Sequence, residues 1–292
     1  MLKDVTRFPA HCGDEDTFLT MMEEAQRHGI KRPSSYSDCF HSAFHSPRIK
    51  HSLNALFAGQ FTGGWEEAKA TGVLPGKWYQ YDMQSAYLWS GSQGLPDAST
   101  FRYADSLSVP NGMFVIDQAA PRVDLPYPFN VRRIVNATRD EIDAYGLNVH
   151  RIVSGVSWTK TISGEQVEEA VKRFTFWKEV GKTYWGRWCS TQPLKCHSRS
   201  GAHWGIRNPV LNLVWAHVVI SRVKLRVWES AKDAAHVFVD SVIVPRKLDV
   251  GTRAGDWRLE DEFSEGVHIR HAGYFGPAGG EWKRTSGTKR SA

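Results

Sequence analysis

The sequence predicts a mixed α and β fold, and three of its patterns lead to this prediction. Two runs of aromatic and β-branched residues, 78–87 and 236–244, have the composition of buried strands. Two other stretches, 163–186 and 208–231, repeat apolar residues at helical spacing. Hydrophobic patterning goes no further than this class, because it does not specify how the strands pair.

The N-terminal part predicts one helix, then irregular chain, then short strands. Residues 14–30 carry apolar side chains at helical spacing and end near Gly29, which predicts a short helix. The segment 31–52 is rich in Ser, Pro and His and is expected to be an irregular arm or connector. Between residues 73 and 130, turn signals from Pro and Gly separate short apolar runs, which predicts strands and loops.

The next elements begin at recognisable caps. Thr138 and Glu141 form a capping-box pattern that is closed by Gly146, and a strand is expected over 149–158.

Two longer helices follow. The first, 163–186, begins at Ser163 or Gly164. The second begins at Asn208 and Pro209, where Pro suits the first turn, and it leads into the run 236–244.

The charge balance favours a polyanionic partner. Lys and Arg number 37 against 31 Asp and Glu, and the sequence pI is about 9.1. The basic stretch 282–290 suits contact with phosphates or simply keeps that end in solution. No apolar run reaches the roughly 18 residues of a membrane span, and residues 1–9 are too charged for a signal peptide. We therefore expect a cytoplasmic protein without a membrane partner.

The four cysteines show no CxxC spacing, so free thiols are expected. A zinc site is the weaker alternative, because no tight ligand pair is present. Its ligands would be His11, Cys12, Cys39 and His41.

Asp82 and Asp240 are the residues most informative about function. Each carboxylate lies in a strand-like apolar run, where a buried charge is costly unless it is paired, hydrogen-bonded or bound to a metal. If the two strands are neighbours, the carboxylates form a hard-oxygen site for Mg²⁺ of the kind used in two-metal phosphoryl transfer. The alternative is that each Asp is a strand-end residue that faces solvent or a nearby Arg.

The helical stretch 163–186 also carries cations. Lys178 and Lys182 are four residues apart and so share one helix face, with Arg187 just beyond. This stripe suits a triphosphate, although a solvated helix face is the commoner explanation of cations alone.

In their order and spacing, these segments resemble the palm and fingers of family B DNA polymerases, most closely the small phage and protein-primed branch. The string 81–87 resembles motif A, 178–187 resembles motif B, and 238–241 resembles motif C. Motif C departs from the family pattern, because Phe238 replaces its first Asp. The candidates to replace that carboxylate are Asp97, Asp105 and Asp233.

Flanking segments extend the resemblance over roughly residues 55–275. Residues 61–66 resemble the aromatic-x-Gly-Gly segment that contacts the template. Residues 255–260 resemble the piece after motif C, and 270–274 lie where the primer-grip segment would be.

The resemblance assigns roles to individual residues. Asp82 and Asp240, with the Met83 carbonyl, would hold two Mg²⁺ or Mn²⁺ ions, and Lys178 would neutralise charge on the incoming triphosphate. The other nucleotide-binding candidates are Ser85, Tyr87, Lys182, Trp185 and Arg187. Among these, Tyr87 would exclude a 2'-hydroxyl and Trp185 would pack against the nascent base pair. Ordinary core packing is the alternative for both aromatics. The DNA-binding candidates are Gly63, Gly64, Ser241, Arg270 and Tyr274.

The resemblance also implies the architecture: an α+β polymerase palm whose antiparallel sheet is backed by helices, short helical fingers, and a thumb that is minimal or absent. The expected order is an N-terminal helix and arm (1–60), palm with motif A (61–162), fingers with motif B (163–200), palm with motif C (201–250), and a thumb remnant with a basic tail (251–292). The chain leaves no room for the 3'-5' exonuclease that normally precedes motif A.

The function implied by the resemblance is template-directed DNA polymerisation from a primer 3'-hydroxyl, without proofreading. The expected partners are primer-template DNA and dNTPs and, beyond these, a terminal protein, a clamp or another replication protein of a phage or mobile element. Two alternatives stay open. One is a primase-like or template-independent nucleotidyltransferase that uses the same metals. The other is a catalytically degenerate palm that acts as a nucleic-acid-binding replication scaffold, an idea motivated by Phe238.

Overall fold

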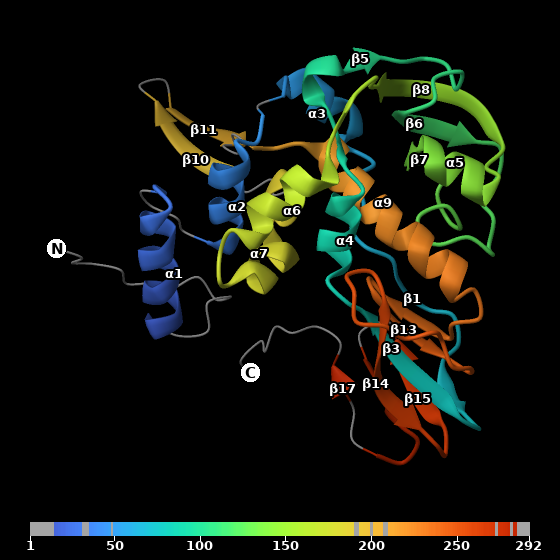
Figure 1. Cartoon of the computed structure of the whole chain (residues 1–292). Helices are drawn as coiled ribbons and strands as arrows, with labels where there is room; N and C mark the ends of the chain where they lie inside the picture. The colour runs from blue at the N-terminus through green and yellow to red at the C-terminus, as the bar shows by residue number, and fades with distance from the viewer. Residues whose placement is uncertain are drawn as a thin grey trace.

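The computed structural model describes residues 15–30, 35–47, 49–189, 193–198, 201–206, 210–271, 274–280 and 283–284. Two sheets lie at one end of the molecule, and a third sheet and most of the helices lie at the other (Figure 1). Helix α9 (Leu213–Ser230) runs between them and is buried over most of its length. The larger sheets are antiparallel, and the predicted mixed α+β class is confirmed.

Both Asp candidates belong to a five-stranded antiparallel sheet with the order β1-β12-β13-β3-β14. Strand β3 (Trp78–Met83) lies between β13 and β14 and buries Tyr79, Tyr81 and Met83, since alternate residues of a strand share a face. The run 78–87 leaves the strand after Met83 and continues as α4 (Ala86–Ser92). The other strands are β1 (Glu66–Ala68), β12 (His236–Phe238), β13 (Ser241–Val244) and β14 (Trp257–Phe263).

The run 236–244 is a hairpin and not the single strand that its composition predicts. Phe238 pairs with Ser241, so Val239 and Asp240 are the two turn residues between β12 and β13. Val239 has a φ of 61°, a conformation that favours Gly, Asn or Asp. A β-branched residue at this position conceals the turn in the sequence. Asp240 therefore lies at the end of the sheet, in the turn itself.

A second antiparallel sheet has the order β17-β16-β15-β2 and shares one apolar cluster with the first, including Ile243 and Phe275. Its strands are β2 (Gly72–Leu74), β15 (Val267–His271), β16 (Tyr274–Pro277) and β17 (Lys283–Arg284). Strand β14 belongs to the segment 251–292 and pairs with β3, so this segment contributes one strand to the five-stranded sheet. Apart from β17, the basic stretch 282–290 lies outside the described residues.

The third sheet, of order β5-β8-β6-β7, packs with helix α5 (Arg139–Tyr145). Thr138 and Glu141 form the predicted capping box, and Gly146 follows in the left-handed conformation. The predicted strand of 149–158 is also confirmed, as β8 (Val149–Ser157). The remaining strands are β5 (Arg102–Tyr103), β6 (Gly112–Gln118) and β7 (Ile134–Thr138).

Helices in the N-terminal part are more numerous than predicted. The expected helix is α1 (Glu15–Arg27), but α2 (Tyr36–Phe44) and the start of α3 (His51–Ala58) occupy the segment 31–52. The prediction of an irregular arm is therefore wrong.

Local interactions explain why α2 forms. The Ser35 hydroxyl accepts a hydrogen bond from the Asp38 N–H and so caps the helix. Tyr36, Cys39 and Phe40 then lie on one helical face and are buried. The Ser- and His-rich composition conceals this short apolar face.

The predicted helix 163–186 is broken into α6 (Gly164–Lys172), α7 (Trp177–Thr183) and the beginning of α8 (Gly186–Cys189). Glu24 of α1 accepts hydrogen bonds from the N–H and the hydroxyl of Thr175 between α6 and α7. Between the two helices the Thr175 N–H has left the helical hydrogen-bond pattern, and the Glu24 carboxylate accepts from it instead. A residue far away in sequence therefore stabilises the break.

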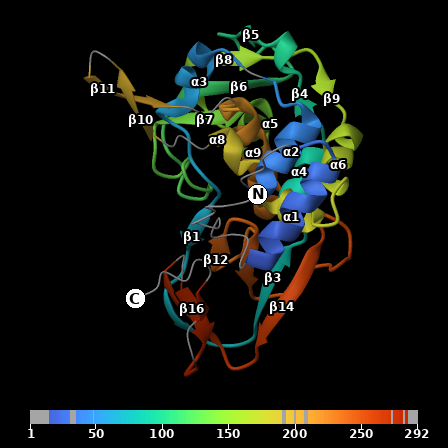
Figure 2. The same ribbon diagram turned by 90° about the vertical axis from the view of Figure 1, so that its left-hand side faces the viewer.

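A hairpin of β10 (Pro193–Ser198) and β11 (Gly201–Ile206) follows and extends away from the body (Figure 2). Helix α9 then begins at Leu213, with Asn212 as its cap. The start predicted at Asn208 and Pro209 lies outside the described residues.

None of the described helices has the length and apolar character needed to cross a membrane. Among the described side chains, Cys39 and Cys189 are free thiols. His41 Nδ1 is 2.8 Å from the Ser46 hydroxyl, while His11 and Cys12 of the alternative zinc site lie outside the described residues.

Candidate active site

Asp82 and Asp240 lie side by side at the end of the five-stranded sheet. Asp82 is the penultimate residue of β3 and pairs with Ser241, the residue that follows Asp240. The Met83 N–H donates to the Asp240 carbonyl over 2.9 Å, which ties the hairpin turn to the end of β3. The turn that carries Asp240 thus lies beside the end of the strand that carries Asp82, as the metal-site hypothesis requires.

The two carboxyl groups have raised pKa values. Burial, followed by the charges of Asp240 and Glu260, raises the pKa of Asp82 to about 7, although Arg258 and Lys182 act in the opposite direction. Burial raises the pKa of Asp240 to about 6, and Lys182 again favours the ionised form. Two desolvated carboxylates that repel each other favour the binding of a cation.

This donor set fits Mg²⁺ or Mn²⁺, which prefer carboxylate oxygens. Asp82 and Asp240 are the residues that would hold it, with the Met83 backbone next to them. Within the described part of the chain, no cluster of three or more His, Cys, Asp or Glu side chains is arranged to hold a metal ion. Among the described residues, the site therefore offers the two carboxylates of Asp82 and Asp240.

The raised pKa values predict a pH-dependent penalty on stability. An Asp in the unfolded chain has a pKa of about 3.9, whereas the folded pKa values of Asp82 and Asp240 are about 7 and about 6. The folded protein therefore loses stability as the pH rises through these folded pKa values and the two carboxyl groups ionise. Without divalent metal, Asp82→Asn and Asp240→Asn should each melt a few degrees above wild type at pH 8 and close to wild type at about pH 4. Thermal melts in EDTA across this range check the prediction, and melting points that stay equal at pH 8 would contradict it.

A hollow of ≈ 480 Å³ opens beside Asp82, and four cationic side chains are among its lining residues. Helix α7 contributes Lys178 and Lys182, which share one face as predicted. Its further charged lining residues are Glu168, Lys172 and Arg258. Asp82 lines this hollow and Asp240 does not, although the charge of Lys182 acts on both carboxyl groups. Cations beside a carboxylate are suited to a polyphosphate that carries a divalent metal.

The nucleotide-binding candidates separate into two groups. Ser85 lines the hollow and directly precedes α4 in a left-handed conformation, with a φ of 47° and no side-chain capping hydrogen bond. Arg187 instead forms an ion pair with Asp38 of α2, at 3.1 Å, and is absent from the lining of this hollow. The predicted role of Arg187 in nucleotide binding therefore has no support from its position.

Tyr87 and Trp185 contact each other. Their rings lie 4.6 Å apart between centroids at an angle of 31°. The Tyr184 hydroxyl donates to the Tyr87 carbonyl over 2.8 Å, and the Trp185 indole donates to the Lys182 carbonyl over 3.1 Å. The Tyr184 bond and the ring contact join α4 to the chain that follows α7, whereas the Trp185 bond is local. The aromatic pair therefore ties the end of the helix that carries Lys178 and Lys182 to α4, which directly follows the strand of Asp82.

The Gly63-Gly64 segment lies against the hairpin turn that carries Asp240. The Val239 N–H donates to the Trp65 carbonyl, and a Cβ on Gly64 would lie 2.8 Å from Val239 Cγ1. Only Gly therefore permits this approach, because real Cβ atoms do not come so close.

The two glycines provide a matched pair of variants. Gly64→Ala should lower the free energy of unfolding by about 1–3 kcal/mol, because Val239 is already held in an unfavourable backbone conformation and cannot easily move. A Cβ on Gly63 meets no atom within 4 Å, so Gly63→Ala should be close to wild type. Urea unfolding of the two variants tests the contact, and equal losses of stability would argue against it.

The DNA-binding candidates near the C-terminal end lie in different sheets. The Ser241 hydroxyl donates to the Tyr81 carbonyl over 3.1 Å, so it supports the sheet beside Asp82. Arg270 is exposed on β15 of the second sheet, and Tyr274 begins β16. Both stay predictions.

None of the three proposed substitutes for the motif C carboxylate has support from its position. Asp97 caps a short 3₁₀ helix by accepting from Ser99, and Asp233 pairs with Arg246. Asp105 lies exposed after β5. Besides Asp240, the carboxylate whose charge acts on Asp82 is Glu260 of β14. Arg258 of the same strand acts on Asp82 with the opposite charge. Sequence reasoning missed this pair, although both residues lie in the segment 255–260.

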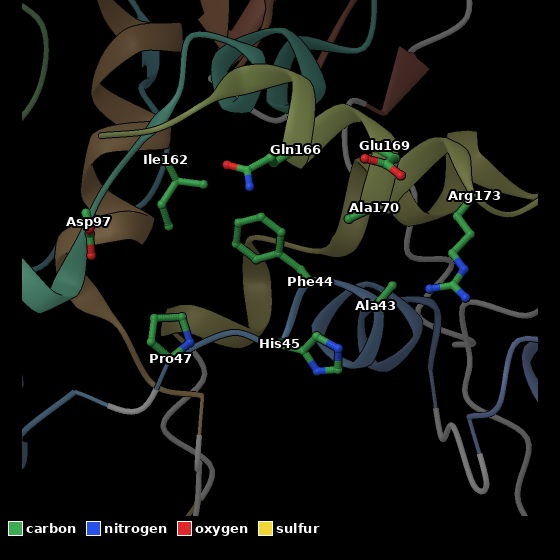
Figure 3. A pocket seen from close by; sticks show the side chains of 10 residues that line it. All are labelled: Ala43, Phe44, His45, Pro47, Asp97, Ile162, Gln166, Glu169, Ala170 and Arg173. Atoms are coloured by element: carbon green, nitrogen blue, oxygen red, sulfur yellow. The ribbon is translucent and has the colours of Figure 1, made fainter. Parts of the chain in front are cut away.

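Helix α6 has a second hollow on its other side. This hollow measures ≈ 470 Å³, and Phe44 of α2 and the Gln166 amide of α6 point into it (Figure 3). Gln166 and Arg173 line this hollow, whereas Glu168 and Lys172 of the same helix line the hollow beside Asp82. The helix therefore separates the two.

No family model matches the chain, and no curated protein sequence matches it either. Solved structures of phi29 DNA polymerase are similar in fold. The binary complex with primer-template DNA gives a TM-score of 0.65 at 11% identity, over 89% of this chain and 57% of that chain. The complex with single-stranded DNA gives 0.65 at 11% identity, over 93% and 60%. This chain thus spans less than two thirds of that polymerase, and at this identity the likeness is one of fold.

Proposed function

We propose that the protein is a template-directed DNA polymerase that adds deoxynucleotides to a primer 3'-hydroxyl. The observation that carries the proposal is that Asp82 of β3 and Asp240 of the adjacent hairpin turn lie together, and that Asp82 lines a hollow with Lys178 and Lys182. The similarity of the fold to part of phi29 DNA polymerase supports the same proposal. A metal-binding carboxylate pair and a cationic wall are the parts that phosphoryl transfer requires.

Each residue has a defined task in the proposed reaction. Asp82 and Asp240 would hold two Mg²⁺ or Mn²⁺ ions, which supply Lewis-acid stabilisation of charge on the reacting phosphate. Lys178 and Lys182 would neutralise the triphosphate and orient it towards the primer. Tyr87, held against Trp185, would close the space around the sugar 2'-position, which predicts a preference for dNTPs over NTPs.

Extension of a labelled primer tests the proposal. Reactions with Mg²⁺ or Mn²⁺ would compare four template bases at the first position and would offer dNTPs or NTPs. Incorporation that follows the template base supports a template-directed polymerase, and discrimination against NTPs supports the role of Tyr87. Incorporation independent of the template would favour the template-independent alternative, and synthesis without a primer would favour the primase-like one.

The scaffold alternative rests on a specific observation. The site brings only two carboxylates together among the described residues, because Phe238 occupies the position of the third. Binding of primer-template DNA without incorporation, under both metals and all nucleotides, would favour a scaffold. A terminal protein, a clamp and other replication proteins stay predicted partners.

A further inference from the structure

Arg258 is a cation placed beside one of the two candidate metal ligands. It lies on β14 directly opposite Asp82 in the β-ladder, and its guanidinium Nη2 is 3.7 Å from Asp82 Oδ2. The same guanidinium contacts Glu260, with Nε 2.5 Å from Oε1. Arg258 is therefore shared between the two carboxylates.

The position of Glu260 follows from an irregularity in β14. Leu259 pairs with Tyr81 and Asp261 pairs with Gln80, so Glu260 is an extra residue without a partner on β3. A β-bulge of this kind commonly redirects a side chain next to a functional site. Here it leaves the Glu260 carboxylate available to Arg258.

A guanidinium and a divalent metal compete for the same carboxylate oxygen. Arg258 satisfies part of the negative charge of Asp82, and this attraction must be weakened before the carboxylate can serve a metal fully. Glu260 offers the guanidinium a second acceptor within reach, so Arg258 need not be expelled into solvent.

We propose that Arg258 is a positioning residue that competes with divalent metal at Asp82, and that Glu260 tunes this competition by holding the guanidinium away. The inference deepens the proposed function and rests on it, because it takes Asp82 as a metal ligand. It concerns metal affinity before DNA or nucleotide binds, and its test needs no turnover.

Titration of the folded protein with Mn²⁺, followed by electron paramagnetic resonance of the free ion, measures that affinity. Arg258→Gln should lower the Kd for Mn²⁺ about three- to tenfold, and Glu260→Gln should raise it by a similar factor. Changes of this size are expected because the Arg258–Asp82 ion pair is partly exposed. Arg246→Gln and Glu262→Gln remove the same charges from the Asp233 and Lys77 ion pairs and should leave the Kd near wild type. Thermal melts would verify that every variant is folded.

The double variant Arg258→Gln/Glu260→Gln separates the proposal from two simpler explanations. If Glu260 acts through Arg258, the double variant should bind Mn²⁺ as tightly as Arg258→Gln alone. A double variant that returns to the wild-type Kd would reveal independent charge effects and overturn the proposal. A double variant that stays weaker than wild type would identify Glu260 as a direct ligand and overturn it as well.

The controls also separate this inference from the proposed function. Unchanged Mn²⁺ affinity in Arg258→Gln, with binding that still depends on Asp82, would overturn the inference and leave the metal site intact. If Asp82→Asn bound Mn²⁺ with the wild-type Kd, Asp82 would not be a metal ligand. Both this inference and the metal site of the proposed function would then be wrong.

Discussion

Replacing Asp240 with Asn is expected to reduce nucleotide incorporation at least about a thousandfold. Asn keeps the shape of the side chain but removes the charge that would hold the proposed metal, and loss of roughly 4 kcal/mol of transition-state stabilisation corresponds to this factor. Asp82→Asn should cause a loss of the same order, because Asp82 pairs with the residue after Asp240 and the two carboxyl groups influence each other electrostatically. Single-turnover incorporation on a primer-template measures the rate of the chemical step directly.

Two controls make the result specific. Asp233→Asn removes a carboxylate that pairs with Arg246 on the surface and should leave incorporation near wild type. Affinity for primer-template DNA should change little in Asp240→Asn, because the lost interaction is to metal. If both active-site variants stayed within about tenfold of wild type, the assignment of these residues as metal ligands would be wrong.

The candidate site was predictable from sequence to the extent that local chemistry marks it. An Asp at the end of an aromatic strand stands out, because buried charge requires a partner, and Lys178 and Lys182 reveal a shared helix face by spacing alone. What sequence could not provide is the register that sets Arg258 opposite Asp82. Pairing between strands that are distant in sequence depends on the whole sheet, and a bulge at Glu260 shifts it by one residue.

Two of the errors in the fold, the continuous helix 163–186 and the continuous strand 236–244, share a physical cause, which is stabilisation by distant partners. The break between α6 and α7 is supported by Glu24 of α1, so nothing in the local periodicity reveals it. The turn at Val239 contradicts local propensity, because its φ of 61° disfavours a β-branched residue, and it is held by the Trp65 carbonyl. Elements with their own signals, such as the capping box at Thr138, were predictable to within a residue.

A buried ionic cluster beneath the Gly63-Gly64 segment is the second place where a single substitution should have a large effect. Glu141 of α5 and His217 of α9 form a contact of 3.1 Å, and both side chains are at most 1% exposed. Ser221 lies about one turn of α9 after His217, and its hydroxyl is 2.9 Å from the Thr138 hydroxyl. Lys224 lies about one further turn along, and its ammonium is 3.5 Å from the Thr62 hydroxyl.

The cluster depends on the charge of Glu141. Burial alone would raise the pKa of this carboxyl, but His217 and Lys224 outweigh that effect and hold it below the usual value. Burial lowers the pKa of Lys224, and Glu141 is the group that counteracts it. Each charge is therefore tolerable only in the presence of the other.

Glu141→Gln is expected to lower the free energy of unfolding by about 3–5 kcal/mol, because it leaves Lys224 as an uncompensated buried cation. Gln preserves the capping box with Thr138, so the loss reports charge and not the cap. Urea unfolding measures it, and Asp143→Asn, which breaks an exposed pair with Arg139, should change stability by less than about 1 kcal/mol.

The double variant Glu141→Gln/Lys224→Met decides whether the charges are coupled. Removing both should restore most of the stability lost in Glu141→Gln, since an apolar side chain of similar length needs no counter-charge. Additive losses would show that Glu141 acts through His217 and its hydrogen bonds and not through the charge of Lys224. Coupling would instead mean that α5, α9 and the chain at Thr62 are held by one electrostatic unit, two residues before Gly64, which touches the Asp240 turn.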